Sequence, residues 1–133
     1  MFVFGNRSLD SLSTADGRWT EICNMALSLG VMDFSVLEGH RNKQKQNAAY
    51  DEDNSQVRWP NGKHNTLPSL AVDLAPYPII WSEGERFRIL AGLIFACAAI
   101  LGYKLRWGGD WNSNGRMRDE KFRDPGHFEL VDA

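Results

Sequence analysis

Residues 62–78 of the chain, GKHNTLPSLAVDLAPYP, contain the strand around which we expect the fold to form. Leu70 to Ala75 are apolar or small except for Asp73, as in a buried strand, and Pro76 and Pro78 end it because proline cannot donate to a strand ladder. A carboxylate inside a buried strand is costly unless it is paired or bound to a metal ion. A structural salt bridge and a metal ligand therefore explain Asp73 equally well at this point.

Patterns on both sides of this strand predict helices. Residues 18–29 carry apolar side chains at spacings of three and four and stop at Gly30, which indicates an amphipathic helix. Residues 82–103 predict a long core helix, with Ser82 as N-cap and Glu85 completing a capping box. A short helix is expected at 44–50, within an otherwise polar stretch from 40 to 63 that we expect to be mostly surface loop.

Three further strands are predicted at residues 34–37, 105–107 and 128–131. Together with the helices they predict an α+β fold, with a small, mainly antiparallel sheet backed by two or three helices. A length of 133 residues suits one domain with one core, so we expect residues 1–133 to form a single domain.

Composition excludes several classes of function. With 15 basic and 17 acidic residues the net charge is -2, which does not indicate a general electrostatic grip on nucleic acid or on an anionic membrane. The longest apolar run, Ile89–Tyr103, is shorter than the ~20 residues of a comfortable membrane span. Cys23 and Cys97 lie in apolar, helix-like stretches and are expected to be buried free thiols, as in a protein made in a reducing cytosol.

Two histidines could join Asp73 at a metal ion. A catalytic zinc site needs three protein ligands with nitrogen, oxygen or sulfur atoms and one open position. His64 precedes the strand of Asp73 and His127 opens the last predicted strand, and adjacent strands lie ~5 Å apart. Asp124 precedes His127 by three residues across a Pro-Gly turn, where it could act as a general base or simply stabilise the turn.

Three segments carry a resemblance to a known family. GKHNTLPSLAVDLAPYP at 62–78, RWGGDW at 106–111 and DPGHFEL at 124–130 resemble the D-alanyl-D-alanine carboxypeptidase-like zinc peptidases. Within that family they are most similar to phage endolysins with L-alanyl-D-glutamate peptidase activity, and the resemblance runs from Glu38 to Leu130. The commonest form of the family motif has a glycine and a shorter spacer between its histidine and aspartate, whereas this chain has eight residues between His64 and Asp73.

The resemblance implies a role for each matching residue. His64, Asp73 and His127 match the zinc ligands and Asp124 matches the general base, which implies metal-assisted hydrolysis of a peptide bond. Arg41 matches an arginine that holds a substrate carboxylate or steadies the transition state.

Two further residues stand next to or within the matching segments. His40, beside Arg41, is next to the site but is not an expected ligand, and Trp107 could wall the substrate cleft or could be core packing.

A polar loop follows the third predicted strand. Asp110, Asn112 and Asn114 fit the first, third and fifth positions of an EF-hand calcium loop, and Glu120 stands one place short of the twelfth. An Asn- and Gly-rich loop with Asx turns is the competing explanation, and Arg116 adds positive charge where a cation would bind. Calcium is therefore a secondary expectation beside zinc.

The expected function is zinc-dependent hydrolysis of peptide bonds in bacterial peptidoglycan by a phage endolysin. Two alternatives remain open: a D,D- or L,D-carboxypeptidase that trims wall peptides, and a non-catalytic zinc-binding domain of the same fold. The expected partners are peptidoglycan peptide stems, without nucleic acid or stable membrane insertion, and the chain is expected to be a monomer. Met1 to Asp10 lacks the pattern of a secretory signal, which favours synthesis in the host cytoplasm and action at the wall after release.

Overall fold

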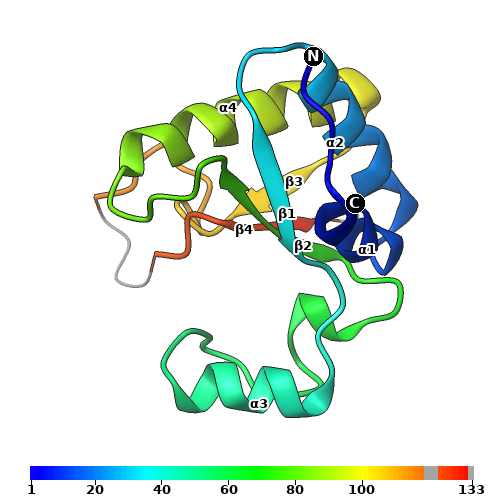
Figure 1. Ribbon diagram of the computed structural model, residues 1–133. Coiled ribbons are helices and arrows are strands. Elements are labelled where there is room, and N and C mark those ends of the chain that lie inside the picture. Colours follow the sequence, from blue (N-terminus) through cyan, green and yellow to red (C-terminus); the bar gives the residue numbers. More distant parts are fainter. Residues whose placement is uncertain (119–122, 132–133) are drawn as a thin grey trace.

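The computed structural model describes residues 1–118 and 123–131, and these form four α-helices, one 3-10 helix and one four-stranded sheet (Figure 1). The α+β class expected from the sequence is confirmed. The helices are α1 (Asn6–Ser13), α2 (Gly17–Ser28), α3 (Lys43–Asp51), the 3-10 helix η1 (Lys63–Asn65) and α4 (Gly84–Leu101). The strands are β1 (Phe34–Glu38), β2 (Ala71–Pro76), β3 (Leu105–Trp107) and β4 (His127–Leu130).

The sheet is antiparallel throughout and has the strand order β1-β2-β4-β3. The strand predicted around Asp73 is β2, and it lies between β1 and β4. Asp73 pairs with Glu38 of β1 on one side and with His127 of β4 on the other, so these three residues form one row across the sheet. The C-terminal strand thus returns to the middle of the sheet and brings His127 next to Asp73.

The two faces of the sheet have different roles. Side chains alternate between the faces along a strand, and Val72 and Leu74 of β2 belong with Phe128 of β4 to the buried hydrophobic core. Asp73 and His127 occupy the alternate positions and therefore lie on the opposite face. The side chain of Asp73 is 20% exposed on that face and lies within 3.5 Å of Arg41, His64 and His127, whose contacts allow a carboxylate within this strand.

Helices α2 and α4 cover the core face of the sheet, and α1 packs against β1 (Figure 1). Trp19 of α2 is fully buried in this core, and its indole N–H donates a hydrogen bond to the carbonyl oxygen of Leu70, 3.0 Å away. The two cysteines, Cys23 on α2 and Cys97 on α4, are buried free thiols, as expected. No helix among residues 1–118 and 123–131 is long and apolar enough to cross a membrane.

Helix α3 and the segment after it stand away from the helical layer, beyond the end of β1 (Figure 1). The Asn42 side chain caps α3 by accepting a hydrogen bond from the Lys45 N–H. Gln46 is the buried residue of this helix, and it connects α3 to the loop that follows through hydrogen bonds to Ser55 and to the Val57 carbonyl. This arrangement places the 54–57 loop opposite the polar face of the sheet, where it lines the pocket described below.

Two details of the helices differ from the sequence expectations. Helix α1 was not predicted. Helix α4 begins at Gly84 with Glu83 as its N-cap, so the predicted capping box between Ser82 and Glu85 is wrong. Ser82 falls inside a turn that is closed by a hydrogen bond from the Glu83 N–H to the Ile80 carbonyl, one residue too early to cap the helix.

Replacing Trp19 with Phe should lower the free energy of unfolding by about 1–3 kcal/mol, because the Leu70 carbonyl loses a buried donor and a cavity forms. Chemical denaturation measures this change. Trp81 is 61% exposed and offers the matched control, since Trp81→Phe should change stability by less than about 0.5 kcal/mol. Equal losses in both variants would contradict the assignment of Trp19 to the core.

Candidate metal centre

Three side chains from separate elements converge on the polar face of the sheet. They are His64 of η1, Asp73 of β2 and His127 of β4, and one ligand atom from each lies within 4.8 Å of the others. His64 Nε2 is 3.1 Å from Asp73 Oδ1 and 3.2 Å from His127 Nδ1, and His127 Nδ1 is 3.5 Å from Asp73 Oδ1. The structure therefore brings together all three of the ligands expected from the sequence.

Backbone hydrogen bonds hold His64 at this position. The 3-10 turn of η1 is closed by a hydrogen bond from the Asn65 N–H to the Gly62 carbonyl. The Arg41 N–H donates to the His64 carbonyl at 2.7 Å, and the Asn65 amide donates back to the Arg41 carbonyl. His64 is thus tied to the chain that leaves β1 as well as to the turn before β2.

The outer nitrogen of each imidazole has a hydrogen-bond acceptor. His64 Nδ1 lies 2.7 Å from the Gly39 carbonyl oxygen, and His127 Nε2 lies 2.9 Å from Glu129 Oε1. A proton on each of these outer nitrogens leaves His64 Nε2 and His127 Nδ1 free to face Asp73. This is the orientation that metal-binding histidines adopt, with the second nitrogen donating to a carbonyl or carboxylate.

The charges at the centre also suit a cation. Burial alone would raise the pKa of Asp73, but the neighbouring imidazoles of His64 and His127 outweigh this effect and hold it well below its usual range. Burial lowers the pKa of His127, whereas its hydrogen bonds to Asp73 and Glu129 raise it to about 9. Asp73 therefore keeps its negative charge, and positive charge between these carboxylates is favoured. Two histidines and one carboxylate are a donor set that fits a catalytic zinc ion.

Glu129 is a residue of this site that the sequence reasoning missed. Its buried carboxylate accepts the hydrogen bond from His127 and lies 3.8 Å from Arg106, its cross-strand partner on β3. Burial raises the pKa of Glu129, but the hydrogen bond and charge of His127, together with the charges of Arg106 and Lys63, bring it below its usual range. The signal was the two-residue separation from His127 within a strand, which puts both side chains on one face.

Arg41 lies beside the centre, and its side chain makes four hydrogen bonds within the protein. Its guanidinium donates to both oxygens of Glu38, at 3.0 and 3.3 Å, to Gln46 Oε1 at 3.0 Å and to Asp73 Oδ2 at 3.3 Å. The structure thus connects Arg41 to a candidate metal ligand. His40, its neighbour, makes a contact of 3.0 Å from Nδ1 to the Thr66 carbonyl and is not part of the ligand cluster.

Asp124 enters the site from the turn that precedes β4. Its N–H donates to the Gly108 carbonyl and its own carbonyl accepts from the His127 N–H, while the Gly108 N–H donates to the His127 carbonyl. A side chain at Gly108 would collide with the Asp124 backbone, so glycine permits this close approach. Burial, and then the charge of Asp73, raise the pKa of Asp124, which brings this carboxylate closer to the range of an effective general base.

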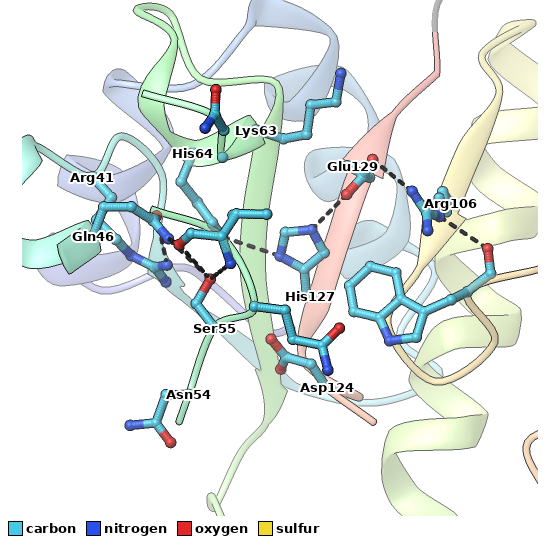
Figure 2. Close-up of a pocket in the computed structure, with 15 residues that line it drawn as sticks. Arg41, Gln46, Asn54, Ser55, Lys63, His64, Arg106, Asp124, His127 and Glu129 are labelled. Carbon is cyan, nitrogen blue, oxygen red and sulfur yellow. Dashed lines mark hydrogen bonds and ion pairs between the residues drawn. The ribbon is translucent and has the colours of Figure 1, made fainter. Parts of the chain in front are cut away.

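A pocket of about 530 Å³ opens onto these groups (Figure 2). Figure 2 shows Arg41, Gln46 and Ser55 on one side of His127, and Glu129 and Arg106 on the other. Further lining residues come from the loop before η1 and from the loop after β3. The pocket is thus built around the proposed ligands, with room for part of a peptide.

The aromatic wall of this pocket is Trp111, not Trp107. Trp107 is buried, stacks on Phe128 at 6.2 Å between ring centroids and donates from its indole to the Pro125 carbonyl. It therefore belongs to the core, the second of the two interpretations given above. The Trp111 ring lies 5.3 Å from that of His127, and alternation along β3 could not have revealed it because it follows the strand.

In the loop after β3, the Asp110 side chain accepts hydrogen bonds from the backbone. Its two carboxylate oxygens accept hydrogen bonds from the N–H groups of Asn114 and Gly115, while Asn112 and Asn114 side chains accept from the backbone two residues on. These are the turns that Asp and Asn form in loops, and they account for the described part of the motif. Glu120 lies outside the described residues. Among those described, the one potential metal cluster is that of His64, Asp73 and His127.

Comparisons with known proteins agree with this geometry. The family model of the phage L-alanyl-D-glutamate peptidases matches residues 1–131. The L-alanyl-D-glutamate peptidase of Escherichia phage T5 is 32% identical over 136 residues, covering 98% of each chain. The crystal structure of the L-Ala D-Glu endopeptidase ChiX of Serratia marcescens superposes with a TM-score of 0.76 at 25% identity, covering 96% of this chain and 89% of that one. The chain therefore belongs to the phage L-alanyl-D-glutamate peptidase family.

Proposed function

We propose that this peptidase hydrolyses the bond between L-alanine and D-glutamate in the peptide stems of bacterial peptidoglycan, at a zinc ion held by His64, Asp73 and His127. The observation that carries the proposal is the convergence of these three ligand atoms within 4.8 Å, beside a pocket that His64, His127 and Asp124 line. The phage T5 relative and ChiX are both named for this bond.

The ligand set defines the chemistry of the site. His64 Nε2, His127 Nδ1 and a carboxylate oxygen of Asp73 would hold the ion, and the protein offers it three ligands, which leaves room for water and substrate. Bound there, Zn²⁺ supplies Lewis-acid chemistry, which polarises a carbonyl and makes water more acidic. Gly39 and Glu129 keep the two imidazoles in the ligating orientation through their outer nitrogens.

Asp124 is the proposed general base. It lines the same pocket as His64 and His127, and its pKa is raised by burial and by the charge of Asp73. Its carboxylate takes a proton from the attacking water and then passes that proton to the leaving amine. The turn through Gly108 and His127 fixes the backbone of Asp124 relative to a metal ligand, which keeps the base at a constant place.

Arg41 is proposed to position Asp73, one of the three proposed zinc ligands. The resemblance implies that it holds a substrate carboxylate or steadies the transition state, and in the structure its donors contact Glu38, Gln46 and Asp73. These contacts support a positioning role, in which Arg41 holds the outer oxygen of Asp73 while the inner one faces the histidines. Substrate contact through Arg41 would require these hydrogen bonds to be exchanged.

We further propose that residues 1–133 act as one monomeric domain at the cell wall, after release from the cytoplasm where they are made. The support is that β1, β2 and β4 each contribute to the site while the same strands share one hydrophobic core. The strands that position Asp73 and His127 are therefore part of the same packed unit.

Digestion of purified Gram-negative sacculi should release stem peptides cut after L-alanine when zinc is present, and a chelator should abolish the release. Mass spectrometry of the fragments identifies the bond. Loss of terminal D-alanine alone would favour the carboxypeptidase alternative. A folded protein that binds zinc but cleaves nothing would favour the non-catalytic domain.

Replacing Asp124 with Asn should lower kcat by about 10²- to 10⁴-fold, the usual contribution of a general base, while zinc affinity changes less than about twofold. Timed digests of a peptide substrate give kcat, and titration with zinc gives the zinc affinity. Asp51→Asn is the matched control, since Asp51 is exposed and pairs with Arg58 away from the pocket. An Asp124→Asn enzyme that retains full kcat would exclude Asp124 as the base.

Replacing Glu129 with Gln should raise the dissociation constant for zinc by about 10- to 100-fold, the usual effect of losing a carboxylate behind a ligating histidine. The amide keeps the shape of the side chain but loses the charge that supports His127. Competition with a zinc-binding dye gives the constant without any need for activity. Glu52→Gln, at the exposed residue that follows α3, is the control, and equal zinc affinity in both variants would argue against the role of Glu129.

A further inference from the structure

We propose that Lys63 and Arg106 form a cationic subsite that binds the free carboxylate of the D-glutamate residue of the substrate. This inference rests on the proposed function and adds a determinant of specificity on the wall of the pocket around Glu129. It follows from the chemistry of the substrate, from the partners of the three cations that line the pocket, and from the number of carboxylates available to neutralise them.

The substrate carries an anion beside the bond that is cut. The amine of D-glutamate forms that bond with L-alanine, and at most one of its two carboxyl groups can be used to continue the chain. At least one carboxyl group therefore stays free, and it is ionised at neutral pH because such groups have a pKa of about 4. A pocket selective for this residue needs a positive group with hydrogen-bond donors available.

Arg41 does not meet this need in the present structure. Of the three cations that line the pocket among the described residues, it is the one whose guanidinium donates to three protein side chains, those of Glu38, Gln46 and Asp73. Its charge is balanced by those carboxylates, and its side chain is 13% exposed. The other two cations are Lys63 and Arg106.

Lys63 directly precedes the candidate ligand His64 and is exposed at the pocket. Its backbone is fixed, because its carbonyl oxygen accepts a hydrogen bond from the Leu70 N–H at 3.1 Å. Within the described residues no carboxylate lies within 4.0 Å of its ammonium group. A substrate carboxylate could therefore reach this group without displacing a protein partner.

Contacts with Trp111 hold the Arg106 side chain at the pocket. Its Nε–H donates to the Trp111 carbonyl at 2.9 Å, and its guanidinium carbon lies 5.0 Å from the centroid of the indole ring. The side chain is 45% exposed, and its nearest carboxylate, Glu129, is 3.8 Å from Nη1. Guanidinium groups held in this way bind carboxylates through parallel hydrogen bonds.

The charge balance leaves this wall positive. Glu129 is the carboxylate that lines it, and one of its oxygens accepts the hydrogen bond from His127 at 2.9 Å. Figure 2 shows Lys63, Arg106 and Glu129 on the same side of His127, whereas Asp124 lies below it and Arg41 on the far side. Two cations thus share one carboxylate that already serves a histidine, and a substrate carboxylate would complete the pairing.

The test uses two synthetic stem peptides that differ in one group, the free carboxylate of D-glutamate or its primary amide. The zinc-loaded full chain should cut the acid with a kcat/KM about 10- to 100-fold above that of the amide, the range expected for a charge-assisted hydrogen bond. Lys63→Gln and Arg106→Gln should each shrink this ratio, and the double variant should bring it close to one. Lys45→Gln, on exposed α3 and outside this pocket, should leave the ratio unchanged.

Three outcomes would overturn the subsite. In the first, the wild-type enzyme cuts both peptides equally well. In the second, the preference for the acid survives in the double variant, which would assign carboxylate binding to Arg41. Cleavage of neither peptide by zinc-loaded wild type would defeat the proposed function itself and the subsite with it. Circular dichroism and zinc titration on each variant separate a change in specificity from a loss of folding or of metal, and a ratio that falls as salt rises would support the charge pairing.

Discussion

The register of β2 between its two neighbours is the constraint on which the rest of the structure depends. It places Asp73 opposite Glu38 on one side and His127 on the other, while Val72 and Leu74 enter the core. A slip of one residue would turn the carboxylate into the hydrophobic layer and two apolar side chains into the pocket. Burial of the core therefore also fixes the positions of Asp73 and His127 in the candidate metal centre.

Three carboxylates gather at that candidate centre. Asp73, Asp124 and Glu129 all lie on one side of the sheet, and each carries a burial penalty. Partly buried carboxylates are tolerated only with compensating charge or hydrogen bonds. Arg41 and the hydrogen bonds of the two histidines supply part of this compensation, and a dication at the candidate site would supply more.

The three cationic side chains that line the pocket differ in their protein partners. Arg41 donates hydrogen bonds within the protein, one of them to Asp73, whereas Lys63 and Arg106 form the proposed subsite for an incoming carboxylate. The sequence resemblance pointed to Arg41 as the carboxylate-binding residue, because a motif records residue type and order. Which arginine has free donors depends on the conformation of Glu38 and Gln46, and no spacing in the chain contains that information.

The sequence by itself determined the α+β class and most strand positions, since alternation and proline stops are local signals. From the His-Asp motif it also predicted the ligand set and the base of the proposed site. It did not reveal α1, and the N-terminus of α4 was misplaced because the two competing caps differ by one residue. Tertiary structure alone decided that Trp111 lines the pocket while Trp107 lies in the core, and that Glu129 supports His127. The physical reason is that these roles depend on which strands are neighbours in the sheet. The pairing of two distant segments cannot be predicted from the sequence of either segment alone.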